Sequence, residues 1–286
     1  MREFVKYLRA IGAAFFFASL GVAAHAQSRP PTAGAPAAAA YTYADLADLT
    51  DAAALVVKVE VKRQAEVEAE RAPGLRPGFA RLYVEAETLS LIAGSAPIGE
   101  SLRYLVDVPR DDRGRVPKLR KGEFIVFAQP VPNRPSELQL ADARAQLDWE
   151  PGLESRLRAI LADLYSGNSL PAIRGVRDAL SVAGNLAGES ETQIFLETEG
   201  NRPVALSIIR RPGMNPVWGY SQAEIVDQSA RPALPGSVDW YRLACFLPRS
   251  LPAEANLAFD AVSQQQAVAD YAFVIAQLGA CSRNRG

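Results

Sequence analysis

The sequence predicts an α+β protein in which a small antiparallel β-barrel precedes a mixed domain of helices and a β-meander. Three observations lead to this fold class. Short segments that alternate apolar and polar residues, separated by Gly and Pro, dominate residues 53–143. Helical periodicity begins near Asp148. Strand-like segments return at Thr192 and are followed by an amphipathic C-terminal helix.

The first 26 residues have the features of a secretory signal peptide. Three basic residues precede an apolar stretch over 10–23, which is too short to span a bilayer comfortably. The small residues of Ala24-His25-Ala26 predict cleavage between Ala26 and Gln27; the alternative is an uncleaved N-terminal anchor. Cleavage would make the protein periplasmic or secreted, with no transmembrane span in the mature chain.

Composition excludes several classes of function. With 31 Lys+Arg against 32 Asp+Glu, the chain has neither a disordered tail's charge excess nor a basic nucleic-acid binder's bulk charge. Its single histidine, His25, lies in the predicted signal peptide. A mature chain without histidine cannot perform Ser-His-Asp or Cys-His catalysis, and two cysteines cannot form a four-thiolate metal site. We therefore expect no metal and no cofactor.

Residues 27–40 are a Pro- and Ala-rich segment, which we expect to be a flexible linker. The barrel domain is predicted over 41–147 and should begin with a short helix over 41–50. Five short strands are then expected at 54–62, 82–92, 102–108, 123–128 and 137–141. Their number and spacing favour a small antiparallel barrel.

The long connection between the third and fourth of these strands ends in residues 121–127, KGEFIVF. Five strands with this connection resemble the OB-type or netrin-like small barrel, over about a third of the chain. The resemblance implies a binding fold and assigns no functional residue. Netrin-like inhibitor and partner modules use several disulfides, whereas this barrel region contains no cysteine.

The second domain is predicted over 148–286. After a helix with an apolar stripe from Leu153 to Leu164, Ser169 is expected to cap a second helix carrying Ile173, Val176 and Leu180. The terminal helix should begin at Ser263, with Gln266 completing a capping box. Strands are expected between them at 192–199, 203–211, 217–220, 223–227 and 238–246.

The two cysteines, Cys245 and Cys281, are predicted to form a disulfide, because an exported chain meets an oxidising compartment. Cys245 falls in the last expected strand and Cys281 just after the terminal helix, so the bond would join that helix to the sheet. The alternative is a pair of free thiols, one of them nucleophilic.

The densest positive segment is the loop 110–121. It is a candidate anion-binding site for a lipid phosphate, a polysaccharide or another polyanion. The alternative is a solvated loop that keeps strand edges apart. No aromatic residue lies among these charges, so no specific nucleic acid is expected. The six candidate residues are Arg110, Arg113, Arg115, Lys118, Arg120 and Lys121.

Three other polar groups in the sequence are candidate sites. An enzyme without histidine would need carboxylates, for which Glu189, Glu191 and Asp227 are the candidates. The acidic residues over 66–70 look like an exposed strand face rather than a calcium site. Arginines and aromatics over 210–241 can bind sugars or a protein, or simply pack in the core.

The sequence therefore predicts an exported, non-enzymatic envelope protein that acts by binding or scaffolding through the 110–121 loop. Its partner would be an envelope protein or an anionic polymer or surface. The alternative is a histidine-free periplasmic hydrolase of carbohydrate that uses the three carboxylates.

Overall fold

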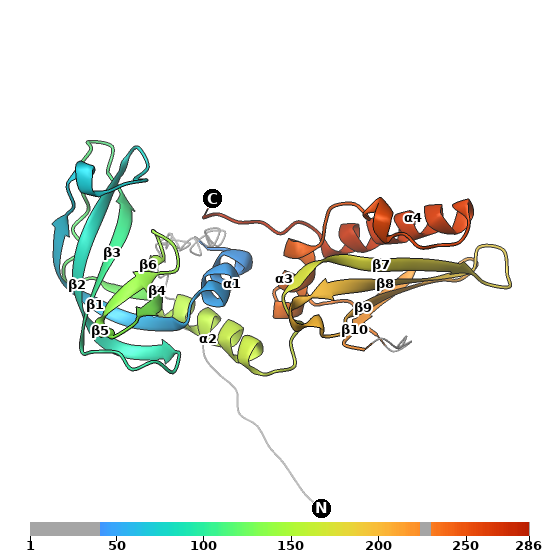
Figure 1. Cartoon of the computed structure of the whole chain (residues 1–286), viewed down its shortest axis with the longest axis horizontal. Helices are drawn as coiled ribbons and strands as arrows, with labels where there is room; N and C mark the ends of the chain where they lie inside the picture. Colours follow the sequence, from blue (N-terminus) through green and yellow to red (C-terminus); the bar gives the residue numbers. More distant parts are fainter. Residues whose placement is uncertain (1–40, 224–229, 286) are drawn as a thin grey trace, which may run out of the picture. The chain divides into compact units, whose positions relative to one another are not determined.

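Five strands close into a β-barrel in the structure of this chain, a computed structural model (Figure 1). It describes residues 41–223 and 230–285, which all belong to one compact unit. The predicted signal peptide, the linker 27–40 and Asp227 lie outside the described residues. In the part of the chain that is described, no helix is long and apolar enough to cross a membrane.

The barrel confirms the predicted fold class and the approximate place of each predicted strand. Its order is β1-β2-β3-β5-β4, and β1 closes the ring by pairing with β4. Neighbouring strands are antiparallel except β3 and β5, which are parallel. A sixth strand, β6 (Gln146–Asp148), adds to β4. The barrel strands are β1 (Leu55–Glu66), β2 (Phe79–Ala93), β3 (Ser101–Pro109), β4 (Glu123–Val131) and β5 (Arg134–Leu140).

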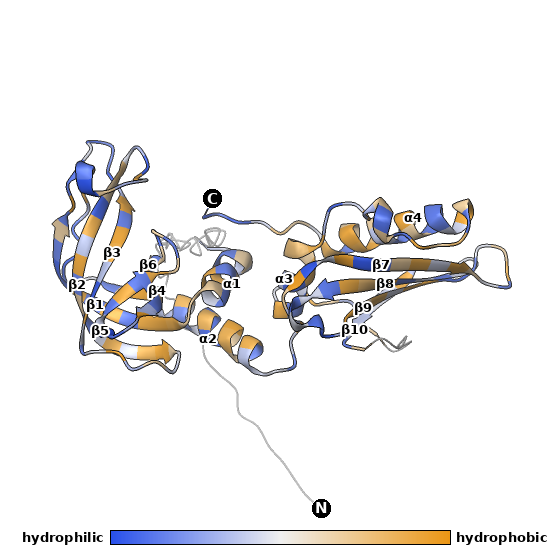
Figure 2. Cartoon of the chain, in the orientation of Figure 1, coloured by the Kyte–Doolittle hydropathy of each residue, from blue (hydrophilic) through white to orange (hydrophobic). Residues whose placement is uncertain are grey.

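Strand β1 is long enough to pair on both sides. Its first half pairs with β4, while nearly its whole length pairs with β2 through three register shifts that let it bend. The alternation seen in the sequence places Val57, Val59 and Val61 in the barrel interior, where they are fully buried. Figure 2 shows this alternation as bands of colour along the strands.

Two helices accompany the barrel. Helix α1 (Tyr43–Ala52) begins with a capping box in which Thr42 and Asp45 exchange hydrogen bonds, and it buries Leu46 against the barrel core. Helix α2 (Pro151–Tyr165) has proline in its first turn, where the missing N–H has no helical partner to lose. Both helices agree with the sequence prediction.

The C-terminal region contains a four-stranded antiparallel meander with the order β10-β9-β8-β7. Helix α4 (Ala261–Leu278) runs along one face of it, and α3 (Val238–Phe246) lies at one end (Figure 1). The strands are β7 (Ile173–Ala183), β8 (Ser190–Thr198), β9 (Ala205–Arg210) and β10 (Val217–Ser221).

The helix predicted after Ser169 is wrong, because this segment is strand β7. Two register shifts, between Ile173 and Gly175 and between Val176 and Asp178, interrupt its pairing with β8. Each bulge inserts an extra residue and disturbs the two-residue alternation expected of a strand, and Leu180, the last residue of the predicted helix face, is exposed.

The strand predicted at 238–246 is also wrong, because it is helix α3. Ser237 caps it by accepting a hydrogen bond from the N–H of Trp240. The aromatic and β-branched residues of the segment favour a strand, and they led to the wrong prediction despite this local capping signal. The terminal helix starts two residues earlier than expected. Its cap is Asp260, which accepts hydrogen bonds from Val262 and Ser263.

Two clusters of buried apolar side chains stabilise the fold. The first fills the barrel and extends through α1 and α2 to Tyr241 of α3. The second lies between the C-terminal sheet and helices α3 and α4. Trp240 packs against both clusters. The division into domains at 147/148 stays a prediction.

Candidate functional site

The predicted basic loop is the connection between β3 and β4, and β1 holds its second half in place. Gln64 of β1 donates a hydrogen bond to the Pro117 carbonyl at 2.9 Å and accepts one from the N–H of Leu119 at 2.5 Å. The Leu119 side chain is buried in the barrel core. The cations on either side of Leu119 therefore lie on a fixed backbone.

Two of the six candidate cations are engaged in ion pairs. Arg110 pairs with Glu66 at the end of β1, and Arg115 pairs with Asp111 at 2.7 Å. Hydrogen bonds from the backbone and side chain of Arg115, and from the backbone of Arg113, hold the pKa of Asp111 below its ordinary value. These two pairs shape the loop and leave little of their charge for a ligand.

The other four candidates form no ion pair with any described residue; they are Arg113, Lys118, Arg120 and Lys121. Lys118 and Arg120 line an open groove of about 690 Å³ together with Lys62, Arg63 and Gln64 of β1. We call this surface the basic groove. Its members come from two segments more than fifty residues apart, so the loop found in the sequence supplies only two of its five residues.

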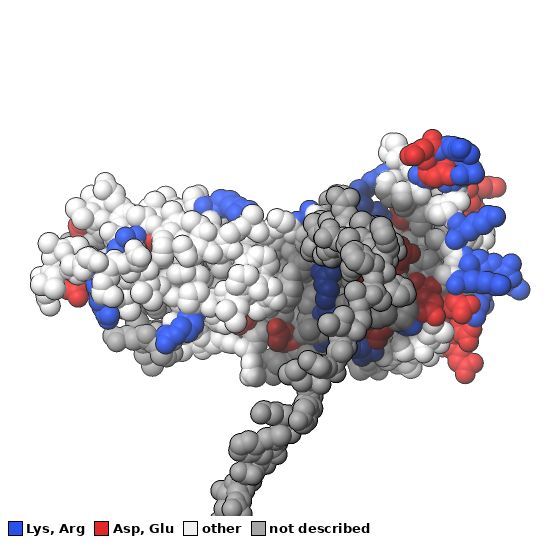
Figure 3. Space-filling view, turned by 180° about the vertical axis from the view of Figure 1, so that it is seen from behind, with Lys and Arg blue, Asp and Glu red and all other residues white. Residues whose placement is uncertain are grey.

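Acidic side chains border the basic groove. Lys62 contacts Glu60 at 2.8 Å and Glu87 at 2.6 Å, and these hydrogen bonds raise its pKa. Arg63 lies 3.7 Å from Glu85. Figure 3 shows blue and red side chains close together over the barrel, at the right of that view. The groove's unpaired charge therefore comes from Lys118 and Arg120.

A second cavity on the barrel, of about 640 Å³, escaped the sequence analysis. Tyr83, Arg103 and Leu105 line it from β2 and β3, and Glu137 from β5. The available signal was Tyr83 and Leu105, large side chains at outward positions of strands. The acidic strand face predicted over 66–70 is wrong, because β1 ends at Glu66 and a 3₁₀ turn follows over Ala69–Arg71. Glu66 and Glu68 line the cavity rim.

Two of the three candidate catalytic carboxylates, Glu189 and Glu191, lie among the described residues of the C-terminal region. Glu189 closes the β7–β8 hairpin by accepting hydrogen bonds from the N–H groups of Asn185 at 3.1 Å and Leu186 at 3.3 Å. Glu191 lies in β8 and accepts a hydrogen bond from Gln193. Asp227 is outside the described residues, and neither Glu189 nor Glu191 lines either of the two barrel cavities.

The arginine and aromatic group over 210–241 is divided among separate contacts. Arg210 forms an ion pair with the fully buried Asp270. Trp240 donates to the carbonyl of Leu278, and Tyr241 donates to Asp48. These contacts hold helices together, whereas Trp218 and Tyr220 of the same group line an open pocket of about 980 Å³.

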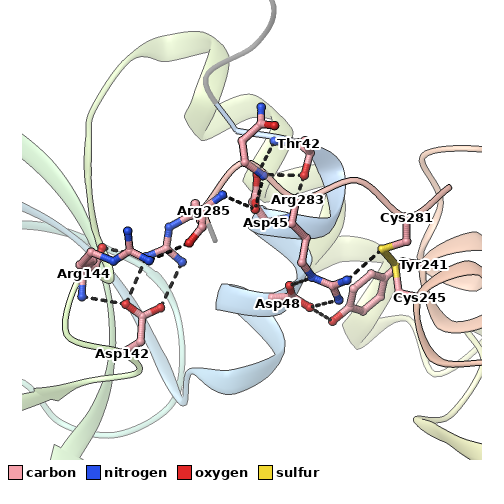
Figure 4. A network of polar contacts seen from close by, with 11 residues as sticks. Thr42, Asp45, Asp48, Asp142, Arg144, Tyr241, Cys245, Cys281, Arg283 and Arg285 are labelled. Carbon is pink, nitrogen blue, oxygen red and sulfur yellow. Dashed lines mark hydrogen bonds and ion pairs between the residues drawn. A yellow bond between two sulfur atoms is a disulfide. The ribbon is translucent and has the colours of Figure 1, made fainter. Parts of the chain in front are cut away.

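Cys245 and Cys281 form a disulfide, which joins α3 to the segment after α4 (Figure 4). The expected partner element is therefore corrected from a strand to a helix. Beyond the disulfide, residues 279–285 form what we call the C-terminal strap. Arg283 reaches Asp48 of α1 at 2.5 Å, and Arg285 reaches Asp142 at 3.1 Å.

Asp45 of α1 is the centre of the strap's attachment (Figure 4). Burial acts to raise the pKa of this carboxyl group. Hydrogen bonds from the backbone N–H groups of Asn284, Thr42 and Arg285, and from the Thr42 hydroxyl, outweigh burial and lower the pKa. Asp45 is therefore held in its charged form by the strap together with Thr42.

The fold and its grooves define an α+β protein built on a closed five-stranded barrel. Comparison with models of known protein families finds no match, and comparison with curated proteins finds no similar sequence.

Proposed function

We propose that this protein is an exported, non-enzymatic binding protein whose basic groove contacts an anionic polymer of the cell envelope. The observation that carries the proposal is the placement of Lys118 and Arg120. Both lie on a backbone segment fixed by Gln64, beside Lys62, and neither forms an ion pair among the described residues.

A fixed backbone favours binding because little conformational entropy remains to be lost when the ligand arrives. Arg120 can donate two parallel hydrogen bonds to a phosphate, sulfate or carboxylate, whereas Lys62 and Lys118 act as compact point charges. The acidic neighbours Glu60 and Glu87 reduce the local potential. Binding should therefore be moderate in affinity and weaken as salt increases.

The barrel topology supports the OB-type resemblance as part of this proposal. The order β1-β2-β3-β5-β4 with a parallel β3–β5 pair gives a five-stranded Greek-key barrel. Barrels of this type bind ligands along the β2–β3 face and its adjoining loops, where the second cavity lies. Arg110 and Glu66 connect that cavity's rim to the basic loop.

Export is supported by the disulfide, since such bonds persist in oxidising compartments. Cleavage between Ala26 and Gln27 is testable by mass spectrometry of protein purified from the envelope fraction. We expect a mature N-terminus at Gln27, and a chain that retains Met1 would contradict cleavage.

The binding proposal is tested by reversing the two unpaired charges, Lys118→Glu with Arg120→Glu. We expect affinity for dextran sulfate to fall at least about tenfold, the scale expected from losing two exposed cationic contacts. The matched control is Arg174→Glu with Arg202→Glu, which changes net charge equally in the C-terminal region. Equal losses in both double variants, or no loss in the first, would contradict the proposed groove.

A further inference from the structure

Exposed apolar side chains concentrate at one end of the C-terminal sheet. The pairing of Ser190 with Arg210 brings the β7–β8 hairpin, 184–189, beside the β9–β10 connection, 211–216. A third segment, 257–262, runs from Ala179 of β7, whose carbonyl accepts from Leu257, into the start of α4. Nine residues into that helix, Asp270 contacts Thr192 and Arg210 near the same end of the sheet. Figure 1 shows the hairpin and the start of α4 at the same end of the sheet. We call these three segments the apolar end.

Each segment of the apolar end presents at least one large apolar side chain to solvent. Phe259 is fully exposed, Val262 is 75% exposed, and Leu186 and Met214 are each 62% exposed. Val217 and Leu257 beside them are also exposed. Exposed apolar groups gathered from separate turns are typical of an interaction surface, whereas isolated ones are not.

The acidic and basic side chains of the apolar end differ in their contacts. Its acidic residues are Glu189 and Asp260, and each is turned toward backbone N–H groups of its own segment. Its basic residue, Arg211, is exposed and forms no ion pair within the described part of the chain. The outward surface therefore combines apolar side chains with one cation.

We infer that the apolar end inserts into the interface of a phospholipid bilayer. Leu186, Met214, Phe259 and Val262 would enter the boundary between headgroups and acyl chains, and Arg211 would lie at the level of the phosphates. A lipid surface fits this pattern because the side chains project from three separate turns. It also fits because the acids are withdrawn while the cation faces outward, complementary to phosphate.

The turns themselves do not need these side chains. Gly188 and Gly213 adopt positive φ values of 81° and 70°, which set the two connections, and the Glu189 carboxylate closes the hairpin through backbone groups. Substitution of the exposed apolar side chains by serine should therefore leave the fold intact.

The test is flotation with vesicles of phosphatidylcholine, with and without phosphatidylglycerol, at high salt so that the basic groove is screened. The chain should begin at Gln27, because the apolar stretch over 10–23 would bind vesicles by itself. This chain keeps every described residue. We expect the triple variant Leu186→Ser, Met214→Ser, Phe259→Ser to lose at least about tenfold in vesicle affinity.

The matched control replaces Tyr165 and Leu234, 67% and 75% exposed but outside the apolar end, by serine. It should bind vesicles like the parent chain. In a parallel series at low salt, Arg211→Glu should weaken binding to vesicles that contain phosphatidylglycerol more than to phosphatidylcholine alone.

Equal vesicle binding by the parent and the triple variant would overturn the inference. So would a parent chain that ignores vesicles but forms a dimer abolished by the triple variant, since the occupant would then be a second copy. The groove variant Lys118→Glu with Arg120→Glu should still float with neutral vesicles, so failure of one proposal is distinguishable from failure of the other.

Discussion

The barrel and the C-terminal sheet differ in how their strand edges are paired and in where their apolar side chains lie. Every strand of the barrel ring is paired on both sides, so most of its apolar residues face an enclosed interior, and its outer face carries ion pairs beside outward side chains such as Tyr83 and Leu105. Lys58 with Glu123 and Arg81 with Asp107 are examples. The C-terminal sheet keeps two edges and has α4 along one face. Closure thus leaves the barrel ring without an unpaired strand edge, while the open sheet has to keep two.

The two regions also differ in what they bury. The barrel interior is apolar, whereas the interface between the sheet and α4 contains Asp270, which is fully buried. Arg210, Thr192 and Gln266 all donate hydrogen bonds to its carboxylate. A buried carboxylate is tolerated only when its oxygens are satisfied in this way. The position of α4 is therefore specified by polar contacts as well as by apolar packing.

The largest expected losses of stability come from substitutions that create a cavity in one of the two cores. Phe127→Ala in the barrel and Leu206→Ala in the sheet should each lower the free energy of unfolding by about 3–5 kcal/mol, because both side chains are completely buried. The predicted domain division implies that each substitution lowers only its own transition in differential scanning calorimetry. A single transition lowered by both would contradict the division.

Loss of the disulfide should lower the unfolding free energy of the C-terminal region by slightly less than these core substitutions. Its partners are 36 residues apart, for which the chain-entropy model gives roughly 3–4 kcal/mol. We expect reductant, or Cys245→Ser with Cys281→Ser, to lower the denaturant midpoint by a corresponding amount. Barrel contacts should persist, since the barrel contains no cysteine. A midpoint that does not respond to reductant would show that the bond is absent or inert.

The smallest effect concerns the strap's attachment at Asp45. Its folded-state pKa lies below the ordinary value of 3.8, so its contribution to stability is present above that pH and is lost as pH falls below it. Asp45→Asn should cost about 1 kcal/mol at neutral pH, the scale of a lost helix cap.

Denaturant unfolding of the parent and Asp45→Asn at several pH values checks this prediction. The difference in unfolding free energy should narrow as pH falls below 3.8. As a control for the loss of one negative charge, Asp112→Asn removes an exposed carboxylate from the basic loop, away from the strap. A difference that is constant with pH would contradict the role given to the Asp45 charge.

Local sequence patterns were sufficient for much of the secondary structure. Alternation in β1, the proline that begins α2 and the spacing of turn residues act over a few neighbours, so the chain encodes them directly. Strand β7 was missed because bulges, which depend on the partner strand, disturb its period. Helix α3 was missed because its tertiary contacts outweigh its strand-like composition.

The proposed functional surfaces also depend partly on local sequence and partly on tertiary structure. The sequence by itself determined the positive loop, the absence of histidine after residue 26 and the two cysteines. Only the tertiary structure decided that Glu66 engages Arg110 while Lys118 and Arg120 stay unpaired, and that three separate turns bring Leu186, Met214 and Phe259 to one end. The physical reason is that ion pairing and exposure depend on distances in space, and strand pairing sets those distances between residues far apart in the chain.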